Sequence, residues 1–254
     1  MRAIAITRQV SPRLAECELT HIERVPIDVE VACTQHHNYV LALRTLGCHV
    51  VELPAEADLP DSVFVEDAAF ILPEVAVISR PGADSRKPET ESVADVLRPH
   101  RELVFVREPA TLDGGDVLVL GKDIYIGLSS RSGQAAIQQL HTLLARFGYC
   151  VQGVELHDCL HLKSAVTRLV QNSLLINRNW VDTRPFEGYE LVDVAESEPK
   201  AANILMLGEA GLYPTAFPET EDKLTARGIS LLTVDVSELA KAEGAITCCS
   251  LILS

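Results

Sequence analysis

One order of elements recurs along this 254-residue chain, and that repeat limits the fold more than any other feature. Its clearest copy begins at residues 111–131, TLDGGDVLVLGKDIYIGLSSR, where a loop leads into a hairpin with predicted strands at 117–120 and 124–126. A helical pattern of apolar residues at three- and four-residue steps follows up to Gly148, and a strand at 149–156 closes the unit. The unit is therefore strand, strand, helix, strand.

The same order recurs at a spacing of roughly 40–50 residues. Further copies begin at VFVEDAAFILPEVAVISRP, at HLKSAVTRLVQNSLLINRNW and at ANILMLGEAGLYPTAF, the second of these with a poorly patterned segment in place of a clear helix. The fifth is split between the ends of the chain: GAITCCSLIL comes last, and RAIAITR, a helix at 29–46 and a strand at 49–54 come first. Five units closed by joining both ends predict a single domain, 1–254, with the fold of a five-bladed α/β propeller of pseudo-symmetric ββαβ units.

Reactive side chains stand at the opening of the first hairpin strand in successive units. They are Glu66, Asp67, Asp113, Asp116, His161, Asn203 and Cys248. Rotation about a common axis would bring equivalent positions together, so residues far apart in sequence are expected to share one central site.

Composition narrows the class of protein. At 47% hydrophobic the chain can bury a substantial core, and it has neither a membrane-spanning apolar run nor a signal peptide, so a cytoplasmic protein is expected. The net charge of −14 disfavours nucleic acid and anionic membranes and suits a small cationic substrate. The odd number of cysteines, seven, predicts reduced thiols. Buried packing is expected for Cys17, Cys33, Cys48, Cys150 and Cys159.

The segment LPDSVFVED holds Asp61, Glu66 and Asp67 beside an apolar strand. Buried carboxylates need a cationic partner, and a guanidinium ligand would satisfy them with bidentate geometry. An internal ion pair with one of the chain's own arginines is the alternative. Arg86 and Arg131 follow equivalent hairpins and would together grip a carboxylate, unless they are only solvated loop residues.

The glycines of TLDGGD let the backbone approach closely and hold Asp113 in a fixed pose, although Asp-Gly is also a common turn signal. His161 alone reads more often as a structural residue than as a catalyst. In TCCS, strand alternation would turn Cys249 toward an apolar face and Cys248 toward the axis. A buried free thiol is the alternative for Cys248. The long loop 8–29 has the length of a lid, and Leu19 within it would close over a ligand or simply pack on the surface.

The segments FVED, TLDGGDVLVLG, HLKS and TCCS, in this order, closely resemble the dimethylarginine dimethylaminohydrolases, a family of guanidino-group-modifying enzymes with a five-bladed α/β propeller. The resemblance implies that Cys248 is the nucleophile, His161 the general acid and base, and Asp113 the acid that orients the histidine and contacts the guanidinium. It further implies that Asp67, with Glu66 nearby, binds the guanidinium. Asp61 and the main chain near Leu19 would hold the substrate amine, and Arg86 and Arg131 its carboxylate. The lid sequence is divergent here.

The expected reaction is hydrolysis of an N-omega-methylated arginine to citrulline and a methylamine through a cysteine thiouronium intermediate, with no cofactor and no metal. The alternatives are an arginine or other guanidine deiminase of the same superfamily, an amidinotransferase that uses the same cysteine, or a non-catalytic ring similar to the ribosome anti-association factors. The oligomeric state is open, and a homodimer is compatible with the sequence.

Overall fold

The two ends of the chain meet in one sheet. The computed structural model describes residues 3–253, so Arg2, where the first strand was predicted to begin, lies outside it. Strand β1, Ile4–Arg8, pairs antiparallel with β15, Leu251–Leu253, and parallel with β2, His49–Leu53. The first blade therefore closes the ring, as the split repeat predicts.

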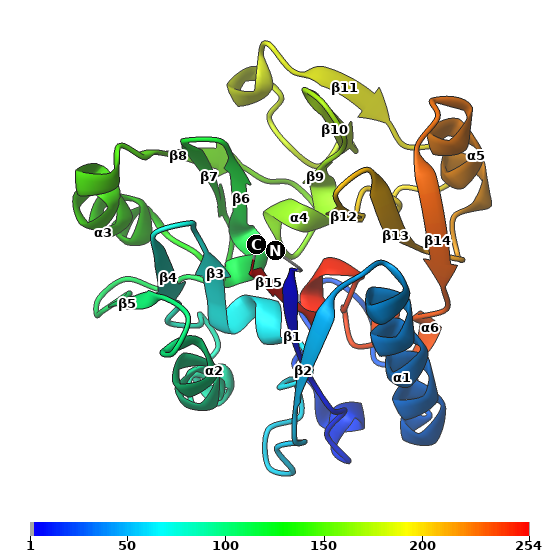
Figure 1. Ribbon diagram of the computed structural model, residues 1–254, viewed down its shortest axis with the longest axis horizontal. Coiled ribbons are helices and arrows are strands. Elements are labelled where there is room, and N and C mark those ends of the chain that lie inside the picture. Colours follow the sequence, from blue (N-terminus) through cyan, green and yellow to red (C-terminus); the bar gives the residue numbers. More distant parts are fainter. Residues whose placement is uncertain (1–2, 254) are drawn as a thin grey trace.

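Four more three-stranded sheets follow around the axis (Figure 1). Their strands, blade by blade, are β3 Ala69–Ile71, β4 Val75–Ile78 and β5 Glu102–Phe105; β6 Val117–Leu120, β7 Asp123–Leu128 and β8 Cys150–Glu155; β9 Val166–Arg168, β10 Ser173–Ile176 and β11 Glu190–Asp193; β12 Leu205–Leu207, β13 Ala210–Pro214 and β14 Ser230–Val234. In each blade the first two strands are antiparallel and the last two are parallel. This is the predicted ββαβ unit, and the propeller fold is confirmed.

Helices lie on the rim of the propeller and connect the two parallel strands of a blade (Figure 1). They are α1 Val29–Thr45, α2 Glu89–Leu97, α3 Gln134–Leu144 and α5 Pro218–Ala226. The poorly patterned fourth unit has only a 3-10 turn, Arg184–Phe186, at this place. Two shorter helices, α4 Leu162–Ala165 and α6 Ser237–Ala240, belong to loops. Within residues 3–253, no helix has the length and apolar character needed to cross a bilayer.

The hydrophobic core is divided among the blade interfaces. One cluster joins the first blade to the second through Ile6, Ile78 and Leu251, and another joins the fifth to the first through Tyr39 and Leu212. The other three clusters join the remaining neighbours in turn. Each blade buries apolar surface on both sides, which explains why all four residues of β4 and of β10 are buried. The interfaces stabilise the ring and fix the blade ends around the axis.

Local sequence signals account for several boundaries. The carboxylate of Asp28 accepts hydrogen bonds from the amides of Glu30 and Val31, and α1 begins at that cap. Gly148 has a φ of 75°, the left-handed conformation that ends the helical segment after α3.

Two expectations about cysteines were wrong. Cys33 and Cys150 are exposed: Cys33 is not on the buried side of α1, and Cys150 is the first residue of β8, an edge strand of its sheet. Cys248 and Cys249 belong to a 3-10 turn, Thr247–Cys249, and not to the strand, which begins at Leu251. The period-two alternation invoked for TCCS therefore does not apply, although both thiols are buried.

Candidate active site

Short turns at the central ends of the blades carry the reactive residues. They are the 3-10 turns Val65–Ala68, Gly114–Asp116 and Thr247–Cys249, together with α4, which follows His161. The turns pack closely: a Cβ on Gly114 would lie 1.9 Å from the carbonyl oxygen of Glu66. Only glycine permits that approach, as the TLDGGD pattern predicted.

A cavity of about 20 Å³ lies among these turns. Six of the nine predicted site residues line it: Asp61, Asp67, Arg86, Arg131, His161 and Cys248. Asp113 and Glu66 lie behind this lining, both buried. Leu19 is half-buried and packs against the core beneath the lid, and its neighbour Glu18 lines the cavity instead. Cys249, also buried, is not part of the lining.

His161 is oriented by Asp113. The His161 Nε2 atom lies 3.1 Å from Asp113 Oδ2. The other carboxylate oxygen of Asp113 accepts a hydrogen bond from the amide of Gly82 at 2.9 Å, and the amide of Asp113 donates to Ser132 Oγ at 3.0 Å. Because these contacts fix both carboxylate oxygens, the imidazole is held in one orientation.

Asp67 lies on the other edge of the imidazole. Its Oδ1 atom is 3.8 Å from His161 Nδ1 and accepts a hydrogen bond from the amide of Gly115 at 2.9 Å. A Cβ on Gly115 would lie 2.6 Å from His161 Nδ1 and 2.7 Å from Asp67 Oδ1. The second glycine of TLDGGD therefore leaves room for the acid and the imidazole to meet.

The cationic partner of Asp67 is Arg86, at 2.6 Å from Asp67 Oδ2. Of the two alternatives for this acid, the structure shows the internal ion pair. Arg86 is buried, and it also binds Glu89 through two hydrogen bonds of 3.1 and 2.8 Å. The edge of its guanidinium formed by Nε and Nη2, which would clamp a substrate carboxylate, is therefore taken by Glu89 in this structure.

Arg131 and Asp61 are placed differently. Among residues 3–253, Arg131 has no carboxylate partner; its Nη2 atom donates to Thr20 Oγ1 at 3.0 Å. Asp61 is buried, and its Oδ2 atom accepts a hydrogen bond from the amide of Glu18 at 3.1 Å. Burial raises the pKa of Asp61, in part offset by Arg86.

Glu66 anchors a second polar cluster below the cavity. It forms an ion pair with Lys163 and accepts a hydrogen bond from Thr247 Oγ1 at 2.8 Å. Asn203 donates to Thr247 Oγ1 at 3.0 Å and accepts from the amide of Thr247 at 3.0 Å. These contacts tie the turn that carries Cys248 to two other blades.

The protonation states of the imidazole and the thiol follow from burial and neighbouring charge. Burial would lower the pKa of His161, but the carboxylates of Asp67, Asp116 and Asp113 outweigh it and raise this pKa to about 9. Burial raises the pKa of Cys248 well above its usual value, and the carboxylates of Glu66 and Asp67 raise it further. Without a ligand the site therefore holds an imidazolium and a neutral thiol at pH 7.

Three of these residues could hold a metal ion. One ligand atom each from Asp67, Asp113 and His161 lies within 4.8 Å of the others. Two carboxylates and an imidazole suit a divalent cation such as zinc.

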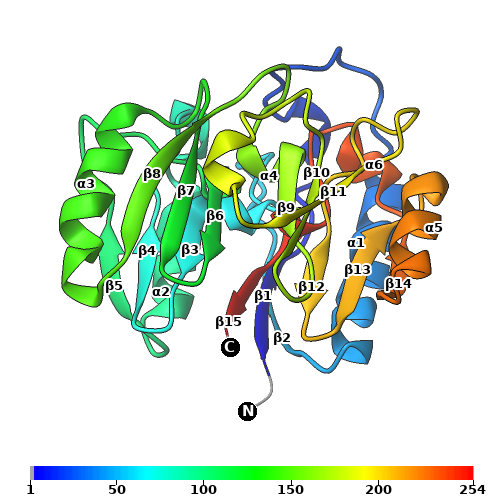
Figure 2. The same cartoon turned by 90° about the horizontal axis from the view of Figure 1, so that it is seen from above.

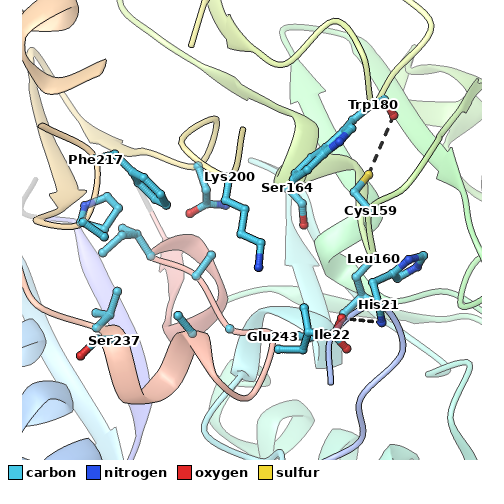
Figure 3. A pocket seen from close by; sticks show the side chains of 18 of the residues that line it. His21, Ile22, Cys159, Leu160, Ser164, Trp180, Lys200, Phe217, Ser237 and Glu243 are labelled. Carbon is cyan, nitrogen blue, oxygen red and sulfur yellow. Dashed lines mark hydrogen bonds between the residues drawn. The ribbon is translucent and has the colours of Figure 1, made fainter. Parts of the chain in front are cut away.

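A larger cavity of about 230 Å³ lies beside the first and shares Leu160, Glu243 and Gly244 with it. In Figure 3, Phe217 and Ser237 stand on one side of it and Trp180 and Cys159 on the other, with Lys200 directed inward. Its lining is mostly apolar and contains none of the nine predicted site residues.

Comparison with known proteins places the chain in a family. The profile described as "N,N dimethylarginine dimethylhydrolase, eukaryotic" matches residues 21–252. The chain belongs to the dimethylarginine dimethylaminohydrolase family. It is 40% identical to the member from Streptomyces coelicolor over 97% of this chain and 95% of that one. It is 33% identical to the member from Pseudomonas aeruginosa over 88% of this chain and 89% of that one.

Solved structures of this family superpose over the whole chain. A cysteine-to-serine mutant of the Pseudomonas aeruginosa dimethylarginine dimethylaminohydrolase complexed with citrulline has a TM-score of 0.94 at 30% identity and covers 100% of both chains. A histidine-to-glycine variant that forms an adduct with S-methyl-L-thiocitrulline has a TM-score of 0.93 at 30% identity, again over 100% of both chains. The amino-terminal domain of ArgZ, an arginine dihydrolase, has a TM-score of 0.88 at 18% identity and shares the fold alone.

Sequence reasoning missed Glu89, Lys163, Thr247 and Glu243. Two of them carried a local signal in the sequence. Glu89 stands three residues after Arg86, at the start of a predicted helix, which is a spacing that allows a local ion pair. Lys163 lies within the HLKS segment. Thr247 and Glu243 have no such signal, because their partners are far away in sequence.

Proposed function

We propose that this protein hydrolyses N-omega-methylated arginine to citrulline and a methylamine, with Cys248 as nucleophile and His161 as general acid and base. The observation that carries the proposal is the shared cavity, in which a thiol, an imidazolium and Asp67 surround one space in a chain 40% identical to a dimethylarginine dimethylaminohydrolase. A protein that only bound a partner would have no need for a thiol beside an imidazolium.

Binding of the substrate prepares the nucleophile. Asp67 has hydrogen bonds to Gly115 and Arg86, and its remaining lone pairs are free to accept the substrate's guanidinium. Its own pKa is lowered, because the charges of His161 and Arg86 outweigh the effect of burial, so it is ionised at pH 7. A guanidinium beside Cys248 lowers the pKa of the thiol, and the thiol proton leaves to solvent.

The thiolate then adds to the guanidinium carbon, forming the carbon–sulfur bond. His161 gives its proton to the methylated nitrogen, the carbon–nitrogen bond breaks and the methylamine departs. Neutral His161 next takes a proton from water, and the hydroxide adds to the thiouronium carbon. Cleavage of the carbon–sulfur bond, with loss of the hydroxyl proton to solvent, then releases citrulline and the thiolate.

Arg131 is the better placed of the two arginines to bind the substrate carboxylate, because it has no carboxylate partner among residues 3–253. Arg86 would act mainly by holding Asp67, to which it is already bound. Asp61 would accept a hydrogen bond from the substrate amine, beside the main chain of the lid.

The test is a parallel assay of asymmetric dimethylarginine, monomethylarginine, arginine and agmatine, with citrulline or the corresponding urea product and the released amine both quantified. Turnover of the methylated arginines, with an adduct on Cys248 trapped by acid and located by peptide mass spectrometry, is the expected result. Preferential turnover of arginine with release of ammonia would instead establish a deiminase.

A further inference from the structure

Glu243 has an unfavourable backbone conformation that the fold maintains. Its φ is 57°, a region that few residues other than glycine, asparagine and aspartate adopt. The next residue, Gly244, packs against Phe64: a Cβ at Gly244 would lie 2.2 Å from a ring carbon of Phe64. A glutamate held in such a conformation, at the wall of the cavity that contains Cys248, suggests a role for its side chain.

The carboxylate of Glu243 binds the main chain of the lid, defined here as residues 18–28. It accepts hydrogen bonds from the amides of Thr20 at 2.5 Å and His21 at 2.7 Å, across more than 220 positions of sequence. The interaction with His21 is drawn in Figure 3, where Glu243 lies beside Ile22. Hydrogen bonds of this kind, from amides to a carboxylate, are stronger than bonds between neutral groups.

The lid crosses the face of the propeller opposite the chain ends (Figure 2). Other contacts also hold the lid. Asp61 accepts from the amide of Glu18 at 3.1 Å, Ser85 donates to the carboxylate of Glu18 at 2.6 Å, Glu238 accepts from the amide of Asp28 at 2.9 Å, Lys241 donates to the carbonyl of Pro26 at 3.2 Å, and Arg131 donates to the hydroxyl of Thr20 at 3.0 Å. Glu243, Arg131 and Asp61 are the contacting residues that also line the cavity with Cys248, and Glu243 is the one that binds two consecutive lid amides.

The closed lid leaves too little space for a substrate. A cavity of about 20 Å³ holds little more than a water molecule, whereas an arginine derivative needs several times that volume. Binding of substrate therefore requires the wall of this cavity to move, and Glu18 of the lid is part of that wall. When the lid takes part in this movement, the hydrogen bonds between Glu243 and the lid amides break and form again.

We propose that Glu243 is a positioning residue that latches the lid over bound substrate through the amides of Thr20 and His21. This inference rests on the proposed function for its effect on turnover, but the latch itself is a property of the free protein. Replacing the carboxylate weakens the latch, so bound substrate is retained less well and KM rises while the chemical step is preserved.

The first readout needs no substrate. Arg24 lies within the lid, where its guanidinium donates to the carbonyls of Ala15 and Cys17, so trypsin is expected to cleave after it faster when the lid detaches. In Glu243→Gln the rate of appearance of fragment 1–24, followed by mass spectrometry, is expected to rise about tenfold, as loss of a charge-assisted interaction predicts. The KM for dimethylarginine is expected to rise by a similar factor, with kcat changed less than about twofold.

Two further variants isolate the carboxylate. Glu243→Gly accepts a φ of 57° without strain but has no carboxylate, so it should show the same faster cleavage with no loss of thermal stability. Glu196→Gln removes an equal charge from an exposed residue distant in sequence from the cleaved bond, with no side-chain hydrogen bond among the described residues, and it should behave as wild type.

Wild-type cleavage rates after Arg24 in both Glu243 variants would overturn the latch. Absence of dimethylarginine turnover by the wild type would instead overturn the proposed function, while the proteolysis would still decide whether Glu243 holds the lid. An equal rise in cleavage for Glu196→Gln would also contradict the proposal, because it would assign the effect to charge alone.

Discussion

Asp67 binds a guanidinium that belongs to the protein: Arg86 Nη1 lies 2.6 Å from Asp67 Oδ2. Glu89 holds the opposite edge of that guanidinium, so two carboxylates and one arginine form a buried chain that ends at the cavity. The chain keeps Asp67 ionised and oriented before substrate arrives. The resemblance assigned Arg86 to the substrate carboxylate and Asp67 to the substrate guanidinium. In this structure Arg86 instead binds Asp67 and holds it in place.

Glu89→Gln should weaken this chain. Burial raises the pKa of Glu89 to about 7, and Arg86 offsets part of the effect of burial. The carboxyl group is therefore partly protonated at neutral pH, so its replacement by an amide costs less stability than the loss of a full buried charge. We expect the free energy of unfolding to fall by about 1–3 kcal/mol, measured in urea, and KM to rise. Glu91→Gln, at an exposed position on the same helix, is the matched control and should change neither quantity.

Arg131→Ala should raise KM for dimethylarginine by roughly 10- to 100-fold, because it removes a charge-assisted contact to the substrate carboxylate. A guanidine without that carboxylate, such as agmatine or its methylated form, separates this effect from the loss of the Thr20 contact. If Arg131→Ala weakens both ligands equally, the arginine acts through the lid and does not bind the carboxylate.

Cys248→Ser and Cys249→Ser distinguish the two adjacent thiols. Cys248 lines the cavity and Cys249 does not, so the first substitution should lower kcat by at least about a thousandfold and abolish the adduct. The second should leave most of the activity. Loss of activity only in Cys249→Ser would show that the wrong thiol has been assigned.

The dependence of kcat/KM on pH should report His161. At neutral pH the free enzyme has a protonated His161, with a pKa near 9, and a neutral thiol, with a pKa raised well above its usual value. Attack requires a thiolate and an imidazolium, so one proton must leave first. We expect kcat/KM to rise about tenfold per pH unit and to level off near pH 9, where free His161 begins to lose its proton.

Asp116→Asn tests the cause of this shift. The carboxylate of Asp116 raises the pKa of His161, so its neutralisation should move the break in the profile to lower pH. Because Asp116 also accepts hydrogen bonds from the amide of Leu162 and from Ser129, the folded fraction must be measured alongside. An unchanged break would indicate that it belongs to another group.

Gly115→Ala should lose activity and destabilise the fold. The added methyl group would overlap His161 Nδ1 at 2.6 Å and Asp67 Oδ1 at 2.7 Å, so either the imidazole or the acid must move. Overpacking of this kind costs about 1–3 kcal/mol. Gly133→Ala, where an added Cβ meets nothing within 4 Å and φ is −121°, is the control and should have little effect on either measure.

The sequence by itself determined the fold, because the propeller repeats one local pattern. Alternating and helical periodicities are set by neighbours in the chain, and the split fifth unit required the ends to meet, as β1 and β15 do. The repeat also brought Asp67, His161 and Cys248 to one axis, since equivalent positions converge under rotation. Each strand and helix was inferred from residues near one another in sequence, and the repetition of the unit then set their arrangement around the axis.

Only the tertiary structure decided how the charges pair. Whether Asp67 binds Arg86, and whether Arg131 forms an ion pair with a carboxylate, depends on distances between blades that no local pattern encodes. The strand assumed for TCCS is a turn, because Cys248 and Cys249 precede the pairing of β15 with β1. The contact of Glu243 with the lid joins segments more than 220 residues apart, and packing of the whole ring places them side by side.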